Sequence, residues 1–466
     1  MAKREISNLD LKIKLTKEYL ENGGVKKIWD KELLKDIINV KFHNGKADPD
    51  TVTSRLNAFM LALLAAQMHP PFYSPNHISE YETTLQKSNS FDQQNIDTPE
   101  QFDKIYEEYK SKTDLLFRGQ REAKWRLYGT LQRHWIQNKL NEKVESYQVL
   151  LQKMVELGRT EYRQKYLEQL GEIHDDADND ISVLSFLQHY GCPTPLLDWT
   201  YKFQNALFFA IDGLDTSVRQ REIDDYFSVY FIEEKDFEKG GMRYLIYESI
   251  ENTQEFALKT LIKQVAKDEE TRIEMEEHFK GRKAIDIKRI KGSGMIAYML
   301  TVEHMVNFPA TYFSDGKPDD ITFSLNNSVN IQNQAGVFTW NADATKPFEM
   351  VVNEQNNEVR KEENADKGPQ QYVLCECFNI NKKLAGYIAK KLEEDGITRE
   401  LIYPVKNFST WDIFEKAVNS ASESKISTQP PEISTQASDF STQPPEVTIP
   451  EDISKVTKEL KKNEHD

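Results

Sequence analysis

The stretch "LLFRGQ", residues 115–120, ends an apolar run with a fixed positive charge, because Arg118 stands directly before Gly119. A guanidinium presents a planar fork of donors that suits phosphate, carboxylate or ribose oxygens. Glycine lets the backbone adopt unusual angles or approach a ligand or a neighbouring segment closely. We expect Arg118 to project from a strand end into a cleft. Taken alone, an Arg-Gly pair is more often part of a structural ion pair.

A second unusual stretch, "FLQHYGCPTPLLDWTYKFQNALFFA", covers residues 186–210 and joins two helix-like apolar segments through a turn rich in glycine and proline. Asp198 follows two leucines and precedes a tryptophan, so we expect it to be buried. A buried carboxylate needs a partner, because an unpaired buried charge costs several kcal/mol. Arg118 is one candidate partner for Asp198.

Three further polar or amphipathic residues of this stretch are candidates for a site: His189, Tyr190 and Thr200. A rigid turn is a good place to hold their side chains in fixed positions. Thr200 is also a candidate N-cap for the helix that follows. A single histidine such as His189 is more often packed and hydrogen-bonded in a core than used as a base.

The third stretch is "NIQNQAGVFTW", residues 330–340, where Gln334 and Gly336 interrupt a β-like run. A glycine inside a strand pattern indicates a bulge or a close backbone approach.

The elements that position these stretches alternate between helical and strand-like patterns, which predicts an α+β fold with a mixed or antiparallel sheet and flanking helices. Thr98 and Pro99 are typical of a helix N-cap and first turn, and residues 380–397 form a helical pattern that ends in glycine. Aromatic and β-branched runs predict strands at 226–234, 295–300, 311–313, 321–325, 336–340 and 372–380.

Three regions differ in composition. We expect a helical N-terminal extension and linker over 1–95, a main domain over 96–418 with a helical insert near 239–290, and a disordered tail over 419–466. The tail repeats "STQPPEI", "STQASDF" and "STQPPEV" every seven residues. Its prolines exclude a coiled coil, and its few apolar residues cannot form a core.

The net charge, the cysteine count and the apolar stretches limit the classes of partner that we expect for this protein. A net charge of −16 makes nucleic acid an unfavourable partner, because phosphates would be repelled on approach. The three cysteines do not predict a disulfide framework, and their spacing favours buried thiols over a metal site, so no metal is expected. The N-terminal residues lack a signal-peptide pattern and the longest apolar stretch near them is too short to span a bilayer, so we expect a cytoplasmic protein without membrane contact.

Taken in order, "FRGQ", "LQHYGCPTPLLDWT...ALFFA" and "NQAGVF" resemble the FRG domain family, which takes its name from a Phe-Arg-Gly motif. The middle stretch carries most of the resemblance because it is long and unusual in composition. The likeness extends over about 100–415, with 239–290 as a variable insert.

The same layout is also similar to that of ADP-ribosyltransferases, which implies NAD as substrate. By this resemblance Arg118 would orient the ribose and phosphates of NAD, and Gly119, Tyr190 and Thr200 would border the cofactor pocket. His189 would be a catalytic candidate, and Gln334 would stand near the place of the catalytic carboxylate. Glutamine cannot serve as a base or stabilise a cationic transition state as a carboxylate does.

These observations support two hypotheses. In the first, the protein has a nucleotide-type pocket and is an active or degenerate ADP-ribosyltransferase-like protein. In the second, it is a non-catalytic module that binds a nucleotide-like ligand or a protein target, with Arg118 and Asp198 in structural roles. The glutamine at position 334 favours the second hypothesis.

Overall fold

The computed structural model describes residues 73–172, 178–216, 221–235, 241–279, 295–315, 323–363, 374–405 and 408–428. The part of the expected N-terminal extension before residue 73 lies outside the described residues, and so do the seven-residue repeats except for their first two residues, Ser427 and Thr428. Residues 419–428, expected to begin a disordered tail, belong instead to helix α21 (Trp411–Thr428).

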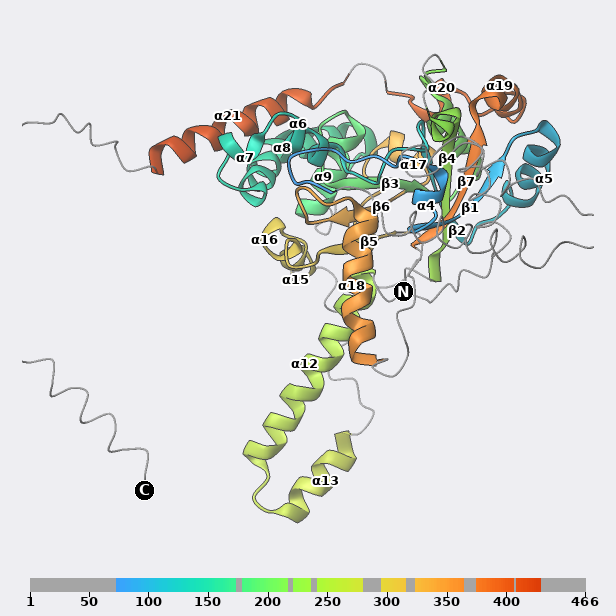
Figure 1. Cartoon of the computed structure of the whole chain (residues 1–466). Helices are drawn as coiled ribbons and strands as arrows, with labels where there is room; N and C mark the ends of the chain where they lie inside the picture. The colour runs from blue at the N-terminus through green and yellow to red at the C-terminus, as the bar shows by residue number, and fades with distance from the viewer. Residues whose placement is uncertain are drawn as a thin grey trace, which may run out of the picture. The chain divides into compact units, whose positions relative to one another are not determined.

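A single seven-stranded sheet organises the described chain, and its strand order is β1-β7-β4-β2-β3-β6-β5 (Figure 1). Only β1 and β7 pair in parallel, and the other neighbours are antiparallel. The α+β class with a mixed sheet is therefore confirmed. The strands are β1 (Phe91–Ile96), β2 (Leu115–Gln120), β3 (Leu196–Thr200), β4 (Tyr226–Glu233), β5 (Ala310–Phe313), β6 (Gly336–Asn341) and β7 (Cys375–Asn381).

Helices alternate with these strands along the chain. They are α4 (Thr84–Lys87), α5 (Pro99–Tyr109), α6 (Thr130–Gln137), α7 (Leu140–Lys143), α8 (Tyr147–Leu170), α9 (Asp180–His189), α10 (Phe203–Ile211), α12 (Met242–Val265), α13 (Glu269–Phe279), α15 (Met295–Met299), α16 (Val302–Met305), α17 (Val329–Gln334), α18 (Phe348–Glu363), α19 (Ala385–Glu394), α20 (Arg399–Ile402) and α21 (Trp411–Thr428), with short 3₁₀ turns η2 (Glu222–Asp225) and η3 (Lys382–Leu384).

Local signals account for several boundaries. Thr98 caps α5 in a capping box with Gln101, and Pro99 is the first helical residue, as predicted. Beyond α19, Gly396 takes a left-handed φ of +75°, which is the backbone conformation that glycine adopts without strain. All three cysteines are buried and free, which confirms the expectation of buried thiols.

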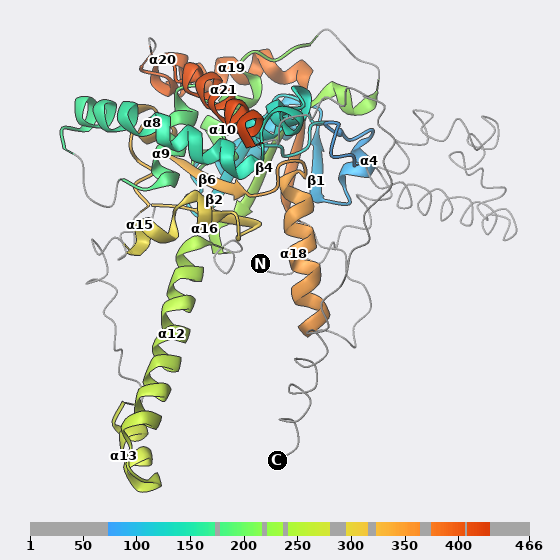
Figure 2. The ribbon, with the colours of Figure 1, turned by 90° about the vertical axis from the view of Figure 1, so that its left-hand side faces the viewer.

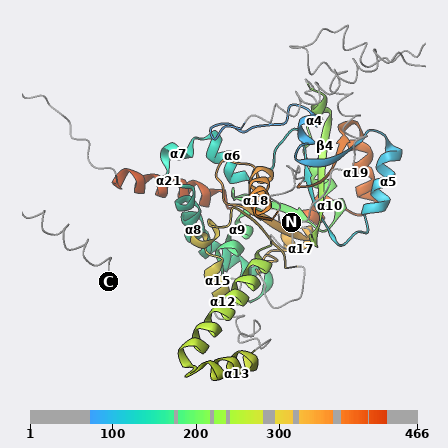
Figure 3. The same cartoon turned by 60° about the horizontal axis from the view of Figure 1, so that its bottom comes forward.

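Two groups of helices cover different parts of the sheet. Helices α5, α10 and α19 pack their apolar side chains against Phe117, Phe231 and Phe378 of the central strands. Helices α8, α9 and α21 share a second cluster with Phe338 and Trp340 of β6. Figures 1 and 3 show these two helical groups at different ends of the sheet.

The opposite face of the central strands carries a third cluster. Leu116, Tyr230 and Cys377 pack there with Trp199 and with the first residues of α18. Figure 2 shows α18 leaving the sheet from this region. Side chains alternate between the two faces along β2, so Phe117 packs in one layer and Leu116 in the other.

The expected N-terminal extension and linker over 1–95 does not end outside the sheet, because its last described residues join the main domain. Residues 91–96 form β1, which pairs with β7 from Phe91↔Cys375 to Ile96↔Ile380. Tyr81 and Phe91 are completely buried. Polar composition misled the prediction, because an edge strand is held by a partner almost 300 residues away.

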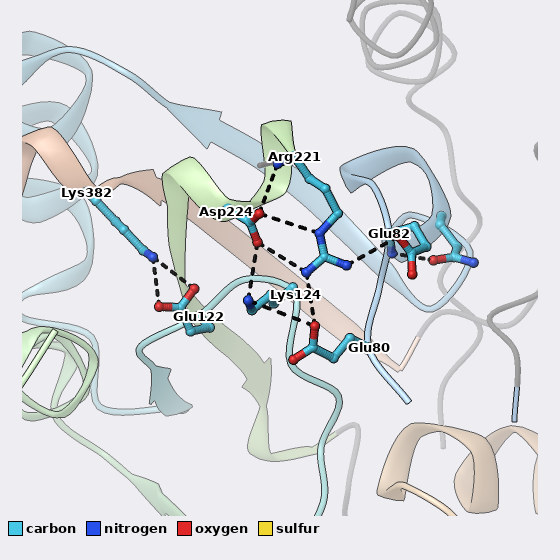
Figure 4. A network of polar contacts seen from close by, with 8 residues as sticks. Glu80, Glu82, Glu122, Lys124, Arg221, Asp224 and Lys382 are labelled. Carbon is cyan, nitrogen blue, oxygen red and sulfur yellow. Dashed lines mark hydrogen bonds and ion pairs between the residues drawn. The ribbon is translucent and has the colours of Figure 1, made fainter. Parts of the chain in front are cut away.

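Ion pairs attach this early segment to the sheet (Figure 4). Arg221 contacts Glu80, Glu82 and Asp224, and Lys124 contacts Glu80 and Asp224. In the same view, Lys382 holds Glu122 at 2.8 Å. The segment before β1 is therefore fixed by charge as well as by apolar burial.

Two predicted strands are also corrected. Residues 295–299 form helix α15, and residues 323–325 belong to no strand, with Ser324 in a left-handed backbone conformation of φ 55°. Short apolar runs fit a helical turn as well as a strand, so their periodicity alone does not separate the two.

A buried ion pair joins the segment between β2 and α6 to α18. Arg126 Nε lies 2.8 Å from Glu349 Oε1, and both side chains are at most 2% exposed. The Tyr81 hydroxyl donates to the same carboxylate oxygen at 2.8 Å, and the Leu127 backbone N–H donates to Oε2 at 3.2 Å. Protein donors therefore bind both oxygens of the Glu349 carboxylate in place of water.

Replacing Arg126 by methionine leaves this carboxylate buried without a cation, and we expect a loss of about 3–5 kcal/mol in the free energy of unfolding. Urea denaturation measures the loss. The control is Lys416→Met, which removes an exposed partner of Asp412 and leaves the unfolding midpoint unchanged. Equal midpoints for the two variants would contradict the structural role of the pair.

Helix α10 crosses β2 at Gly119 with no space for a side chain. A Cβ atom at this position would lie 1.9 Å from the Ala206 carbonyl oxygen and 2.9 Å from the Ala210 nitrogen. Both atoms belong to the helix backbone, so no side-chain rotation relieves the clash. Gly119 therefore permits the close packing of α10 on the sheet.

Gly119→Ala should destabilise the fold by at least about 3 kcal/mol, because α10 must shift as a unit. The matched control is Gly386→Ala in α19, where an added Cβ meets nothing within 4 Å. That control should be neutral or slightly stabilising, since alanine favours a helix over glycine. Thermal unfolding of the two variants compares them directly, and similar melting temperatures would be inconsistent with the close approach.

Candidate functional site

Strands β2 and β3 pair at a single position, Phe117↔Thr200, whereas β2 pairs with β4 at six positions. The residues of β2 after Phe117 therefore have no ladder partner in β3. Arg118 bridges this opening, because its Nη1 donates to the backbone oxygen of Asp198 at 2.6 Å. The opening between two strands of one sheet is where the candidate site lies.

A cavity of about 280 Å³ occupies this place. Its walls come from the end of β2, the C-terminal end of α9, β3, and single residues of other elements. The lining residues are Phe117, Arg118, Gly119, Gln120, Arg121, Trp125, Arg133, Gln188, His189, Asp198, Trp199, Thr200, Phe209, Asp212, Gln334 and Tyr403.

Six of the residues singled out from the sequence line this cavity, and they come from four elements. They are Arg118, Gly119, His189, Asp198, Thr200 and Gln334. The seventh, Tyr190, lies elsewhere. Its hydroxyl exchanges hydrogen bonds with the Gln169 side chain, and its ring packs against Phe186 and Phe408.

Asp198 departs from the expectation of burial, because its side chain is 47% exposed. Neighbouring Leu197 and Trp199 point into the apolar layer, and alternation along β3 turns Asp198 to the other side. Arg118 binds the backbone oxygen of Asp198, so no direct ion pair with the carboxylate forms. The carboxylate Oδ1 instead accepts a hydrogen bond from Gln188 Nε2 at 2.5 Å.

Arg118 is largely removed from solvent. Burial lowers the pKa of its guanidinium, and the nearby Asp198 charge acts in the opposite direction. Its Nε is buried and has no hydrogen-bond partner among the described residues. Among the described residues, the Arg118 guanidinium therefore has a hydrogen-bond partner for Nη1 but not for Nε.

His189 is a neutral imidazole at physiological pH. Its side chain is 5% exposed, and burial lowers its pKa to about 4 against a smaller upward effect of Asp198. Its Nε2 lies 3.9 Å from Asp198 Oδ1, beyond hydrogen-bond distance, and has no partner among the described residues. The ring rests against Phe338.

Thr200 and Gln334 are bound to each other rather than directed at a ligand. The Thr200 hydroxyl donates to the Gln334 backbone oxygen at 2.6 Å and accepts from the Lys202 N–H at 3.1 Å. Gln334 Nε2 donates to the Ile402 carbonyl at 3.1 Å. Lys202, and not Thr200, is the N-cap residue of α10.

The β-like interpretation of residues 330–335 is also wrong. These residues end helix α17, and the chain reverses at Ala335, which has a left-handed φ of 49°, before β6 begins at Gly336. The polar residues Asn330, Gln332 and Asn333 in this stretch are more compatible with a capped helical turn than with a strand.

Sequence reasoning missed two further arginines, Arg121 and Arg133. Burial and the nearby charges of Arg118 and Arg121 lower the pKa of Arg133 to about 10. Its guanidinium donates to the Tyr128 carbonyl at 2.7 Å and to Thr130 Oγ1 at 3.1 Å. Arg121 follows the "FRGQ" motif directly, so its position was a usable signal, whereas Arg133 reaches the cavity only through the packing of α6.

Three arginines and two aspartates thus line the cavity, together with a third unpartnered buried atom, Gln120 Oε1. Buried polar atoms without partners are rare in folded proteins. The residues Arg118, Gln120 and His189, each with one such buried atom among the described residues, line the same cavity.

Comparison with protein families matches an FRG domain model to residues 113–218. The chain contains an FRG domain. Its matched span starts just before β2, includes α6 to α9 and β3, and ends after α10, so it supplies Arg118, His189 and Asp198 but not Gln334. No curated protein and no solved structure matches the chain. Among the described residues, no helix of the FRG-domain chain is long and apolar enough to cross a membrane.

The lowered pKa of His189 predicts a pH dependence of stability. The unfolded chain binds a proton at this histidine near pH 6.5, whereas the folded protein resists it down to about pH 4. Stability contributed by the neutral ring is present above pH 6.5 and is lost as the pH falls towards 4, by about 3 kcal/mol in total.

His189→Gln removes this titration. We expect its free energy of unfolding to fall less between pH 7 and pH 4 than that of the wild type, by about 3 kcal/mol. Urea denaturation at the two pH values measures the difference. Parallel pH profiles for both proteins would contradict the buried neutral state of His189.

Proposed function

We propose that the cavity of the FRG domain binds a nucleotide-type, NAD-like ligand and that its arginines receive the anionic part. The observation that carries this proposal is the gathering of three unpartnered buried atoms, on Arg118, Gln120 and His189, around one cavity. Leaving such atoms unpaired costs about 1–3 kcal/mol each, and a ligand that pairs them recovers this free energy on binding.

The donor and acceptor pattern fits a phosphorylated sugar. Arg118 Nε donates and suits a phosphate, ribose or carbonyl oxygen, whereas Gln120 Oε1 accepts and suits a hydroxyl or amide N–H. Arg121 and Arg133 also line the cavity and add positive charge to its wall. The protein as a whole has a net charge of −16, whereas three arginines and two aspartates line the cavity.

Aromatic residues complement the charge. Trp125 is 38% exposed and lines the cavity with Phe209 and Tyr403, which offers flat apolar surface for a planar ring. A volume of about 280 Å³ is at the lower end of small-molecule sites. We infer that it takes one end of a dinucleotide, a ring with its ribose and phosphate, and leaves the remainder outside.

Two forms of this function are supported by different observations. An ADP-ribosyltransferase-like enzyme needs a reactive carboxylate, and the half-exposed Asp198 supplies one in the cavity. A non-catalytic module that binds a nucleotide-like ligand or a protein target is favoured by Gln334, whose amide N–H is engaged by Ile402. Ligand binding through Arg118 is common to both forms.

Arg118→Lys tests this common step, because lysine keeps the charge but loses the planar fork. We expect NAD or ADP-ribose to bind the variant at least about tenfold more weakly than the wild type, measured by isothermal titration calorimetry at low salt. The melting temperature without ligand shows whether the variant is folded.

The matched control is Arg272→Lys on helix α13, an exposed arginine paired with Glu269 and Glu276. It should bind the ligands as the wild type does. Absence of NAD and ADP-ribose binding by the wild type, or an unchanged dissociation constant in Arg118→Lys, would refute the proposed site.

A further inference from the structure

The cavity of the FRG domain holds two carboxylates that are not equivalent. Asp212 is neutralised by Arg399, whose Nη1 lies 2.5 Å from its Oδ1. Asp198 has no such cation: Arg118 binds its backbone oxygen, and the nearby His189 is neutral. Among the described residues, Gln188 is the one side chain that donates to the Asp198 carboxylate, through Oδ1, which leaves Oδ2 available.

The orientation of the Asp198 carboxylate is fixed by a chain of hydrogen bonds. The Leu196 N–H donates to Thr194 Oγ1 at 3.3 Å, and the Thr194 hydroxyl donates to Gln188 Oε1. With its oxygen occupied in this way, the Gln188 amide must turn its N–H group to Asp198. The half-exposed Asp198 side chain is thus held in place by the neutral amide of Gln188. This donor orients the carboxylate without neutralising it.

One polar atom without a hydrogen-bond partner among the described residues lies near this carboxylate. It is His189 Nε2, 3.9 Å from Asp198 Oδ1. The separation is too long for a direct hydrogen bond, and Nε2 is buried, so a water or hydroxyl can approach the carboxylate only from its exposed side. A hydroxyl bound there would face a carboxylate oxygen that no described side chain occupies. That is the arrangement by which a general base accepts a proton.

We infer that Asp198 is a catalytic residue that acts as general base on a water or hydroxyl attacking the bound ligand, with Gln188 as its positioning residue. This inference rests on the proposed nucleotide-type function and deepens it. It replaces Gln334 by Asp198 as the group that handles the proton.

The other titratable groups of the cavity indicate which bond is broken. A departing alkoxide would need a proton donor, but His189 is unprotonated at neutral pH, and burial with the charges of Asp212 and Asp198 raises the pKa of Tyr403 to about 12. The guanidinium groups of Arg118, Arg121 and Arg133 remain charged and are poor acids. A leaving group that departs neutral without protonation therefore suits this cavity.

A pyridinium N-glycoside, the bond between nicotinamide and ribose in NAD, meets this condition. The water oxygen bonds to C1′ of the ribose, and the C1′–N bond breaks with its electron pair passing to the ring nitrogen. Nicotinamide leaves as a neutral molecule, and the proton of the attacking water passes to Asp198 and then to solvent. NAD and water thus give ADP-ribose, nicotinamide and one proton, and a hydroxyl acceptor in place of water gives transfer.

The test incubates the full chain with NAD and follows nicotinamide release by chromatography, with NAD binding measured separately by calorimetry. Asp198→Asn keeps an oxygen for Gln188 but removes the base. We expect release to fall about 10²–10⁴-fold while the dissociation constant for NAD changes less than about threefold. The matched control is Asp103→Asn on α5, which removes an exposed carboxylate paired with Lys391 of α19. It should release nicotinamide as the wild type does.

Gln188→Leu provides a readout that a purely structural role would not move. Without the Gln188 donor the Asp198 carboxylate loses its fixed orientation, so kcat for nicotinamide release should fall at least about tenfold while KM for NAD changes less than about threefold. An unchanged kcat would overturn the positioning role of Gln188.

The remaining outcomes separate this inference from the proposed function. Undiminished release by a folded Asp198→Asn variant overturns the role of Asp198. Wild-type protein that binds NAD without releasing nicotinamide overturns catalysis and leaves the binding site standing. Wild-type protein that does not bind NAD overturns both.

Discussion

The close approach of helix α10 to strand β2 at Gly119 is the constraint on which the rest of the site depends. An added Cβ would lie 1.9 Å from a helix carbonyl, so the helix can occupy this position only because residue 119 has no side chain. The approach brings the β3–α10 connection, with Thr200 and Lys202, against the end of β2. The motif glycine therefore acts on packing first, and its place in the cavity wall follows from that packing.

The second consequence is an opening in the sheet. Since β2 and β3 share one paired position, the polar backbone and side chains beyond it need other partners. Arg118 satisfies one of them by donating to the Asp198 carbonyl, and the cavity occupies the remaining space. A residue with several donors is suited to both tasks, because one nitrogen can hold the strand while another faces the cavity.

Charge is distributed unevenly around this opening. The buried pair of Arg126 and Glu349 is complete and belongs to the scaffold, whereas the cavity leaves atoms of Arg118, Gln120 and His189 without partners. Buried groups that are fully paired stabilise the fold, and those left unpaired lower its stability unless a ligand binds. The cavity therefore differs from the Arg126–Glu349 pair in being lined by residues whose buried polar atoms have no partner among the described residues.

The sequence by itself determined the α+β class, the capped start of α5, the FRG motif and six of the residues that line the cavity, because these depend on local propensity and on short motifs. It did not determine that β1 joins β7, that Asp198 is half exposed or that Tyr190 turns away. Nor did it reveal Arg133 and Gln188 as neighbours of Arg118. Those facts depend on strand pairing and helix packing between segments distant in the chain, and only the tertiary structure brings such segments together.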